Sequence, residues 1–355
     1  MNRDIFSLSP YSLKKEQKEA FLLEKLQELT LFHKLHCPEY ANILLAFGYK
    51  EQNYKTLEDF FALPVRLFKE YDLKSSNEIV KTLTSSGTTS TQVSKIYLDK
   101  ETARLQTKAL IKIMQDFLSA ERLPMLILDT KAILKDRKKF SARAAGVMGL
   151  ANFGRKHVYA FDEHMNLDRE AILAFQEEYK DQKVLLFGFT FMIWQYFYKE
   201  LRKENIKLHL DKAILFHSGG WKKLEDEAVS DSYFKESLAK QTGIKNIHNF
   251  YGMVEQVGSI FVACEYGHLH TPNFADIIIR DPFSLEVLEH GKEGIIELLS
   301  IIPQSYPGHV LLSEDRGIIL GEDDCKCGRC GKYFKVLGRI KEAEVRGCSD
   351  TFEGK

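Results

Sequence analysis

Hydrophobic residues at the start of the chain recur with the spacing of an α-helix. They lie on one predicted helical face: Phe21, Leu22, Leu26, Leu29 and Phe32. We expect this helix to begin near Ser12, whose hydroxyl can cap it, and a second helix to end at Phe47 before Gly48. Residues 1–80 are therefore predicted to form an N-terminal helical scaffold.

Short apolar strands alternate with amphipathic helices through the middle of the chain. Strands are expected at residues 125–128, 183–187, 213–216 and 246–250, and helices at 101–117, 141–151, 168–179, 191–201 and 224–239. This alternation is typical of an α/β sandwich with a largely parallel sheet. Residues 81–258 are predicted to form this core, with ligands at the carboxyl ends of its strands.

The pattern changes after Gly258. Short strands separated by Gly, Pro and Asp turns are expected at residues 259–263, 276–280, 294–300, 310–313 and 317–320. Such a series favours an antiparallel, β-rich subdomain over residues 259–339, followed by a short C-terminal tail at 340–355.

Composition narrows the possible classes of protein. The 355 residues are 44% hydrophobic, which is enough for a large core, and 50 basic residues balance 50 acidic ones. We therefore expect neither nucleic acid nor an anionic membrane as a partner. Without a signal-like or membrane-spanning run, and with clustered cysteines, the sequence favours a cytoplasmic protein.

The segment Thr84 to Thr91 is rich in hydroxyls around one glycine, Gly87. Backbone N–H groups and uncharged hydroxyls suit the oxygens of a polyphosphate. The segment lacks the Gly-Lys-Ser/Thr ending of a Walker-type loop, and a solvated Ser/Thr linker is the alternative interpretation.

Two further motifs follow predicted strands. Ser218-Gly219-Gly220 would let a flat ligand approach the backbone, although an ordinary turn fits as well. In Tyr251-Gly252-Met253-Val254-Glu255 the aromatic ring can stack on a base and the carboxylate can reach a metal-bound phosphate. Here a core tyrosine and a surface carboxylate are the alternatives.

Thiol and imidazole groups occur in two clusters. Cys325-Lys326-Cys327-Gly328-Arg329-Cys330 forms one, and Cys264 with His268-Leu269-His270 forms the other. Paired clusters of this kind are typical of a structural zinc site, with reduced, unliganded thiols as the alternative.

Taken in order, these motifs resemble those of the adenylate-forming enzymes. Thr84–Thr91 is similar to their phosphate loop, Ser218–Gly220 to their adenine-facing turn and Tyr251–Glu255 to their Tyr-Gly-x-Thr-Glu signature. Glu314-Asp315-Arg316-Gly317 resembles the segment whose aspartate holds ribose, and Leu337-Gly338-Arg339-Ile340 resembles the hinge. The whole chain is most similar to phenylacetate–CoA ligases and, more closely, to the LuxE acyl-protein synthetases.

The resemblance implies a fold and a reaction. The fold is the large N-terminal domain of the adenylate-forming enzymes, a layered α/β sandwich with an antiparallel β subdomain. In this reaction ATP and a carboxylic acid, expected to be a fatty acid, give an acyl-AMP and pyrophosphate, and a thiol then takes the acyl group. It assigns Ser85, Ser86, Gly87, Thr88 and Thr89 to phosphate, Ser218, Gly219, Gly220, Tyr251 and Gly252 to adenine, Glu255 to Mg²⁺, Asp315 to ribose and Arg339 to phosphate or ribose.

The resemblance also implies the acceptor and the zinc ligands. Only residues 340–355 follow Arg339, so we expect no full lid domain and no lid lysine. Cys348 lies in Arg346-Gly347-Cys348-Ser349, which resembles the LuxE segment that carries the acyl group, and a thiol near a free end is a suitable nucleophile. Cys264, His270, Cys325 and Cys327 match a zinc pattern of the phenylacetate–CoA ligases, with Cys330 or His268 as possible replacements.

The sequence thus predicts an acid–thiol ligase that loads its own Cys348 or a partner protein, either a reductase subunit or an acyl carrier protein. Two alternatives remain at this stage. One is an acyl-CoA synthetase similar to phenylacetate–CoA ligase, and the other is a non-catalytic, zinc-containing module that binds nucleotide.

Overall fold

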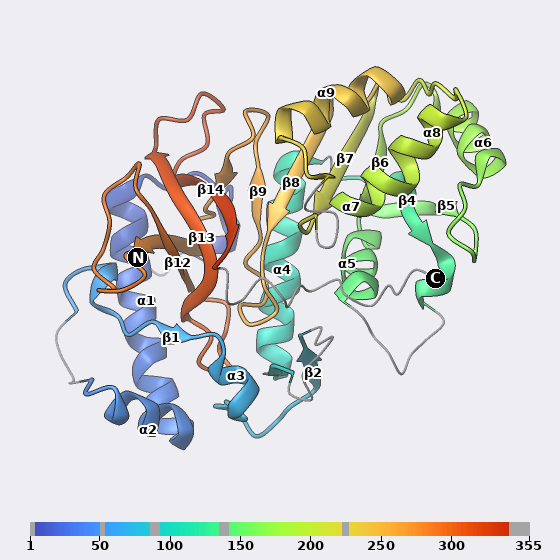
Figure 1. Cartoon of the computed structure of the whole chain (residues 1–355). Coiled ribbons are helices and arrows are strands. Elements are labelled where there is room, and N and C mark those ends of the chain that lie inside the picture. Colours follow the sequence, from blue (N-terminus) through green and yellow to red (C-terminus); the bar gives the residue numbers. More distant parts are fainter. Residues whose placement is uncertain are drawn as a thin grey trace. The chain divides into compact units, whose positions relative to one another are not determined.

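The computed structural model describes residues 4–49, 54–85, 93–118, 120–134, 142–221 and 227–340. The described residues form two compact units (Figure 1). Unit 1 holds those up to Phe117 and those from Tyr251 onward, and unit 2 holds those from Leu118 to Phe250. The N-terminal helices and the C-terminal strands therefore belong to the same unit.

After the short 3-10 helix η1 (Ile5–Ser7), unit 1 contains the long helix α1 (Lys15–His36) and the shorter α2 (Pro38–Ala46). Pro38 occupies the first position of α2, where its missing N–H costs no hydrogen bond. The second helix ends at Ala46, one residue before the predicted end at Phe47. The predicted cap at Ser12 is wrong: α1 begins at Lys15, and the Ser12 N–H donates to Asn273 Oδ1 at 3.1 Å instead.

The main sheet of unit 1 is mostly antiparallel. Its strand order is β11 (Ala275–Arg280), β12 (Glu293–Ser300), β13 (Val310–Glu322), β14 (Lys332–Arg339), β10 (Leu269–His270) and β9 (Phe261–Ala263). The short β1 (Leu63–Pro64) pairs in parallel with β13. The prediction of antiparallel strands in this part of the chain is confirmed.

The two strands predicted at 310–313 and 317–320 are one strand, β13, and its partner β14 was not predicted. The register of β13 against β14 shifts between Arg316 and Gly317. Glycine inside a strand often marks such a bulge. The sequence pattern instead predicts a turn between residues 313 and 317.

A buried charge cluster joins α1 to this sheet. Lys18 Nζ lies 3.5 Å from Asp276 Oδ1, and Lys332 Nζ lies 3.3 Å from Asp276 Oδ2. All three side chains are buried, and Lys18 also donates to Thr271 Oγ1 at 2.7 Å. Burial tends to raise the pKa of Asp276, but the two lysines hold it below its usual value.

Four further elements belong to the N-terminal part of unit 1. They are the short helix α3 (Leu67–Glu70), the antiparallel hairpin of β2 (Lys81–Thr84) and β3 (Lys95–Leu98), and the long helix α4 (Lys100–Phe117). The strand β2 directly precedes the hydroxyl-rich loop and β3 follows it. The helix predicted at residues 101–117 is confirmed as α4.

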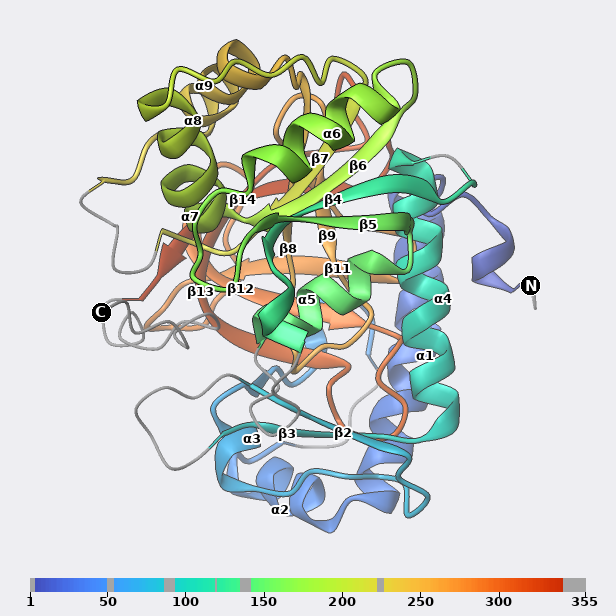
Figure 2. The ribbon, with the colours of Figure 1, turned by 90° about the vertical axis from the view of Figure 1, so that its right-hand side faces the viewer.

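Unit 2 is built on a parallel sheet. Its strand order is β8 (Asn246–Tyr251, of which Tyr251 belongs to unit 1), β7 (Ala213–Ser218), β6 (Val184–Phe189), β4 (Leu123–Thr130) and β5 (Gly154–Phe161). All eight residues of β4 are buried, as expected for a strand covered on both faces. Figure 2 shows α5 (Ala142–Ala151) on one face of this sheet and α6 (Arg169–Tyr179) on the other.

The other helices of unit 2 connect its strands. A continuous helical segment runs through α7 (Thr190–Met192), the π-helical η4 (Ile193–Tyr198) and α8 (Lys199–Lys203), and α9 (Asp231–Thr242) follows β7. The parallel sheet is confirmed, although β5 was not predicted. The helix predicted from residue 224 begins at Asp231, because Ser230 caps it by accepting from the Tyr233 N–H at 3.2 Å.

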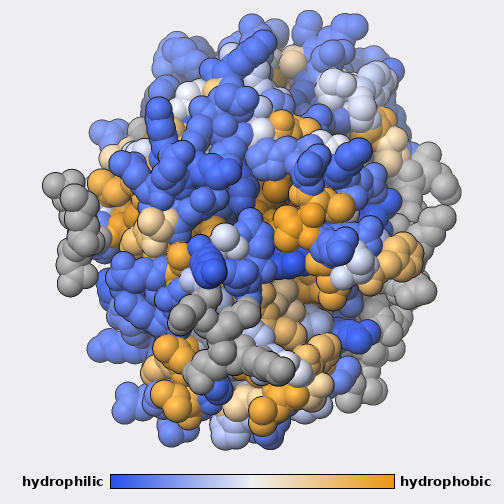
Figure 3. Space-filling model, turned by 90° about the vertical axis from the view of Figure 1, so that its left-hand side faces the viewer, coloured by the Kyte–Doolittle hydropathy of each residue, from blue (hydrophilic) through white to orange (hydrophobic). Residues whose placement is uncertain are grey.

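On the face shown in Figure 3, hydrophilic residues predominate and hydrophobic ones form separate groups between them. Among the described helices, none combines the length and the apolar character that crossing a bilayer requires.

Candidate active site

The hydroxyl-rich loop leaves the β2–β3 hairpin at Ser85 and returns at residue 93. Ser85 N–H donates to the Ser94 carbonyl at 3.1 Å, and Ser94 N–H donates to Ser85 Oγ at 3.0 Å. These two bonds close the base of the loop. The predicted phosphate-binding residues Ser86, Gly87, Thr88 and Thr89 lie outside the described residues.

Three residues that the sequence placed in separate motifs meet in unit 1. The Tyr251 hydroxyl donates to Asp315 Oδ2 at 2.7 Å, and Arg339 Nε donates to Asp315 Oδ1 at 3.3 Å. Asp315 on β13 and Arg339 on β14 are register partners across the sheet, so the ladder fixes their separation. The Asp315 carboxylate therefore has a defined orientation.

The Tyr251 ring is held by packing as well as by its hydroxyl. It stacks on Phe261 with ring centroids 6.1 Å apart and meets Phe334 edge-on at 6.4 Å. Burial and the neighbouring Asp315 carboxylate raise the pKa of Tyr251 well above its usual value. The phenol thus stays protonated and remains a hydrogen-bond donor to Asp315.

Glu255 lies in the same unit, four residues after Tyr251. Burial raises the pKa of Glu255, while the Ser94 hydroxyl and the positive charges of Lys69 and Arg339 lower it in part. Ser94 is fully buried, and its backbone closes the base of the hydroxyl-rich loop. Nothing in the sequence singles out Ser94, a buried hydroxyl residue at the base of that loop.

The Ser218–Gly220 turn lies in unit 2, at the end of β7. Gly219 has a φ of +83°, a conformation that favours glycine, and Gly219 and Gly220 are exposed. The Ser218 hydroxyl donates to the Phe250 carbonyl on β8 at 2.9 Å. A Cβ atom at Gly219 would lie 3.2 Å from the Phe189 ring, so a larger residue would crowd this turn.

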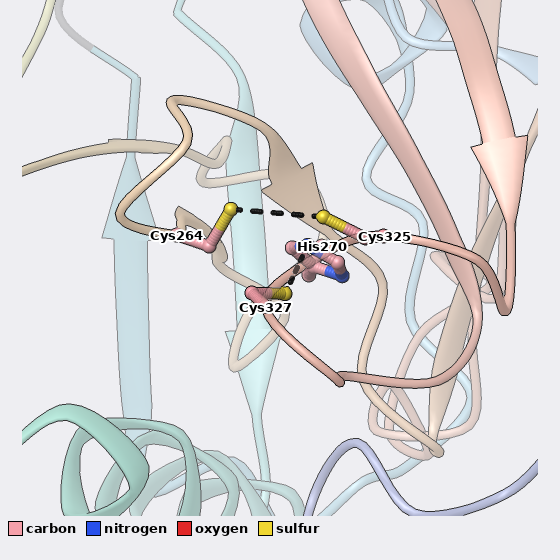
Figure 4. Close-up of side chains that lie close together, drawn as sticks. All are labelled: Cys264, His270, Cys325 and Cys327. Atoms are coloured by element: carbon pink, nitrogen blue, oxygen red, sulfur yellow. Dashed lines mark hydrogen bonds between the residues drawn. The ribbon is translucent and has the colours of Figure 1, made fainter.

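The four predicted zinc ligands converge in unit 1. The ligand atoms of Cys264, His270, Cys325 and Cys327 all lie within 4.8 Å of one another (Figure 4). Cys264 and Cys325 have their sulfurs 4.0 Å apart, and Cys327 Sγ lies 3.3 Å from His270 Nε2. Three thiols and one imidazole form a donor set suited to tetrahedral zinc.

The neighbouring candidates lie at the edge of this cluster. His268 Nδ1 is 3.5 Å from Cys325 Sγ, but its ring stacks on Tyr333 with centroids 5.0 Å apart. Cys330 is outside the group of four, and its N–H donates to the Tyr11 carbonyl at 3.0 Å. The tail residue Cys348 lies outside the described residues.

Comparison with solved structures identifies the fold. A crystal structure of 2-hydroxyisobutyryl-CoA ligase, in an open conformation with 2-HIB-AMP and CoA, has a TM-score of 0.71 at 16% identity and covers 96% of this chain and 82% of its own. The same ligase in the postadenylation state with 2-HIB-AMP has a TM-score of 0.69 at 15% identity, covering 96% and 74%. The fold is that of the acid ligases that form an adenylate, as the sequence predicted.

Comparison with protein families is more specific. The sequence model of the family described as "Acyl-protein synthetase, LuxE" matches residues 1–355. The chain therefore belongs to the LuxE family of acyl-protein synthetases, and the prediction of an AMP-forming acid–thiol ligase is confirmed at this level.

Two relatives carry the name long-chain-fatty-acid–luciferin-component ligase. The one from Aliivibrio fischeri is 20% identical over 358 residues, covering 97% of this chain and 91% of the relative. The one from Vibrio harveyi is 25% identical over 134 residues, covering 37% of this chain and 34% of the relative.

Proposed function

We propose that this protein uses ATP to convert a carboxylic acid into an acyl-adenylate and then transfers the acyl group to a protein thiol. In the first step a carboxylate oxygen attacks the α-phosphorus of ATP, and pyrophosphate leaves. In the second step a thiolate attacks the acyl carbonyl carbon, and AMP leaves. The observation that carries the proposal is the convergence of Tyr251 and Arg339 on the Asp315 carboxylate.

The nucleotide would be held in three places. Asp315 has a fixed carboxylate that can accept hydrogen bonds from the ribose hydroxyls, and Arg339 can pair with phosphate as well as with Asp315. The residues proposed for adenine are Tyr251 and Gly252 in unit 1 and the turn of Ser218, Gly219 and Gly220 in unit 2. Ser85 and the loop that follows it would donate hydrogen bonds to the phosphates.

Two metals fit the side chains present. Glu255 can bind Mg²⁺, whose role would be to neutralise phosphate charge while two anions approach each other. Zinc fits Cys264, His270, Cys325 and Cys327, and its role would be structural, because three thiolates and an imidazole fill its four positions.

The acyl chain would lie along the face of the parallel sheet that α5 covers. Phe187 and Phe189 on β6 present aromatic rings there, and a Cβ atom at Gly146 of α5 would lie 3.0 Å from Phe189. An apolar surface of this kind suits a fatty acid, the substrate in the names of both relatives. The acceptor would be Cys348, and from it a partner protein such as a reductase subunit or an acyl carrier protein.

Carboxylate-dependent exchange of pyrophosphate into ATP tests the first step. We expect exchange with acids of a defined chain length, and no exchange with any acid would contradict the proposal and favour a nucleotide-binding module. Cys348→Ser tests the second step, with Cys330→Ser as the matched control. Exchange should persist in both variants, whereas labelled acyl-protein should disappear only in Cys348→Ser. Formation of acyl-CoA at an unchanged rate in Cys348→Ser would instead favour a CoA ligase.

A further inference from the structure

Two buried polar side chains lie directly beneath the Ser218–Gly220 turn of unit 2. Thr190 Oγ1 is 2.9 Å from His217 Nδ1 and 3.2 Å from the Ser218 carbonyl oxygen. Thr190 is only 6% exposed and His217 only 3%, whereas the two glycines of the turn are exposed. A buried polar pair thus contacts the backbone of a surface turn.

The number of available protons fixes the direction of these hydrogen bonds. Thr190 has a single hydroxyl proton, which it donates to the Ser218 carbonyl. Its oxygen can then only accept, so Nδ1 of His217 must carry the imidazole proton and donate it. This leaves Nε2 of His217 without a proton, and that buried atom has no hydrogen-bond partner among the described residues.

A neutral imidazole is consistent with its surroundings. Burial lowers the pKa of His217 to about 3, and its ring packs against Phe234 with centroids 4.9 Å apart. Breaking either hydrogen bond of Thr190 would leave a buried polar group without a partner, which costs free energy. Both hydrogen bonds are therefore expected to persist. The direction from His217 to Thr190 to Ser218 is therefore maintained near neutral pH.

This chain of hydrogen bonds connects the ends of the neighbouring strands β6 and β7. Thr190 is the first residue of α7 and follows the end of β6, while His217 and Ser218 end β7. Ser218 is tied on its other side to Phe250 of β8 through its hydroxyl. The turn that follows has no side chain at Gly219 or Gly220, so bonds to Ser218 hold its start in place.

We propose that Thr190 and His217 are positioning residues, which set the conformation of the Ser218–Gly220 turn for the adenine of the nucleotide. This inference rests on the proposed function, because it takes that turn to face adenine. Neither residue needs to touch the nucleotide. They act through the Ser218 carbonyl, and the exposed glycines then present their backbone to the flat base.

Thr190→Val tests the inference, because it keeps the shape of the side chain and removes the hydroxyl. We expect the affinity for AMP, measured by calorimetry on the full chain, to fall about tenfold, which corresponds to about one buried hydrogen bond. Thr190→Ser restores the hydroxyl and should bind AMP within about twofold of the unaltered protein. The KM for the carboxylic acid should stay unchanged in both variants.

His217 provides a second and independent pair of variants. Asn places an amide donor near the position of Nδ1, and Gln places it near that of Nε2. We expect His217→Asn to retain AMP affinity better than His217→Gln. This pair also decides the question if Thr190→Val fails to fold.

Three outcomes would contradict the inference. Equal AMP affinity in Thr190→Val and Thr190→Ser would overturn it, as would equal affinity in the two His217 variants. A parallel change in AMP affinity and in the KM for the acid would indicate a general loss of structure instead. If the unaltered protein bound neither ATP nor AMP, the proposed function itself would be wrong.

Discussion

The Tyr251 hydroxyl donates to Asp315 Oδ2 at 2.7 Å, although the two residues lie 64 positions apart in the sequence. One residue was singled out for stacking on a base and the other for holding ribose, and neither motif predicts that they bond directly. Asp315 is 8% exposed, so its carboxylate is largely removed from bulk water. A donor fixed on one of its oxygens limits how the other can turn toward a ligand.

This bond gives a prediction for nucleotide affinity. Asp315→Asn keeps the size of the side chain but removes the charge that Tyr251 and Arg339 share. Hydrogen bonds to a charged group contribute about 1.5 to 3 kcal/mol, so we expect the KM for ATP in the exchange assay to rise about 10- to 150-fold. Glu286→Gln, at an exposed carboxylate of the same unit, is the control and should leave the KM unchanged. An unchanged KM in Asp315→Asn would remove this residue from the ribose site.

A second prediction concerns Glu255 and pH. Burial raises the pKa of Glu255, so its carboxylate takes up a proton at a higher pH than an ordinary glutamate does. If the ionised form binds Mg²⁺, exchange should decline on acidification while exposed carboxylates are still charged.

Glu255→Gln removes the ionised form at every pH. We expect the exchange rate to fall about 10²- to 10³-fold. Raising the Mg²⁺ concentration should restore part of the acid-side loss in the unaltered protein but none of the loss in the variant. Full activity of Glu255→Gln would show that another group binds the metal.

A third prediction concerns the Cys/His cluster. The protein as purified should contain one zinc per chain by elemental analysis, and a strong chelator should lower its melting temperature. Cys325→Ser should lose the metal, because it removes one of the four converging donors. Cys330→Ser is the matched control from the same segment and should keep it. Zinc loss in Cys330→Ser, with retention in Cys325→Ser, would reverse the assignment of these two thiols.

A fourth prediction concerns stability. Asp276→Asn leaves Lys18 and Lys332 buried without their shared counter-charge, and removing one partner of a buried ion pair costs about 3 to 5 kcal/mol. We expect a loss of this size in the free energy of unfolding, measured by denaturant titration near neutral pH. Glu101→Gln breaks the exposed pair with Arg104 and should cost less than about 1 kcal/mol.

The pH dependence of the free energy of unfolding tests the contribution of the Asp276 charge. Because the pKa of Asp276 is lower in the folded state, its contribution to stability is present above the usual carboxyl pKa. It is lost as the pH falls through the lower, folded-state value. The difference in stability between the unaltered protein and Asp276→Asn should therefore shrink in acid. A constant difference would mean that the asparagine disturbs packing rather than charge.

The sequence predicted the Cys/His cluster better than it predicted the strands around it. Cys-x-Cys and Cys/His spacing report ligand chemistry directly, and all four named side chains converge. β14 was not predicted, although it carries Arg339 and bonds to β13. Strand pairing is a contact between distant residues, and local periodicity contains little information about it.

Two other residues were not singled out from the sequence because their importance also depends on contacts between distant parts of the chain. Ser94 and Thr190 are ordinary hydroxyl residues in sequence, and they matter because they are buried beside Glu255 and Ser218 respectively. Whether a polar side chain is buried depends on the packed fold and cannot be read from its neighbours in the sequence. His217 directly precedes the Ser218–Gly220 motif in sequence, but its direction of proton donation follows only from the contacts of Thr190 with His217 and Ser218.

The β13–β14 hairpin joins two of these features in one ribbon of chain. Its closed end contains Cys325 and Cys327, and its open end pairs Asp315 with Arg339. A slip of one residue between the two strands would turn every side chain of one strand to the opposite face. A metal held at the closed end would therefore also keep Arg339 facing Asp315 at the open end. If the proposed nucleotide site is right, removing that metal should lower nucleotide affinity although Asp315 and Arg339 are unchanged.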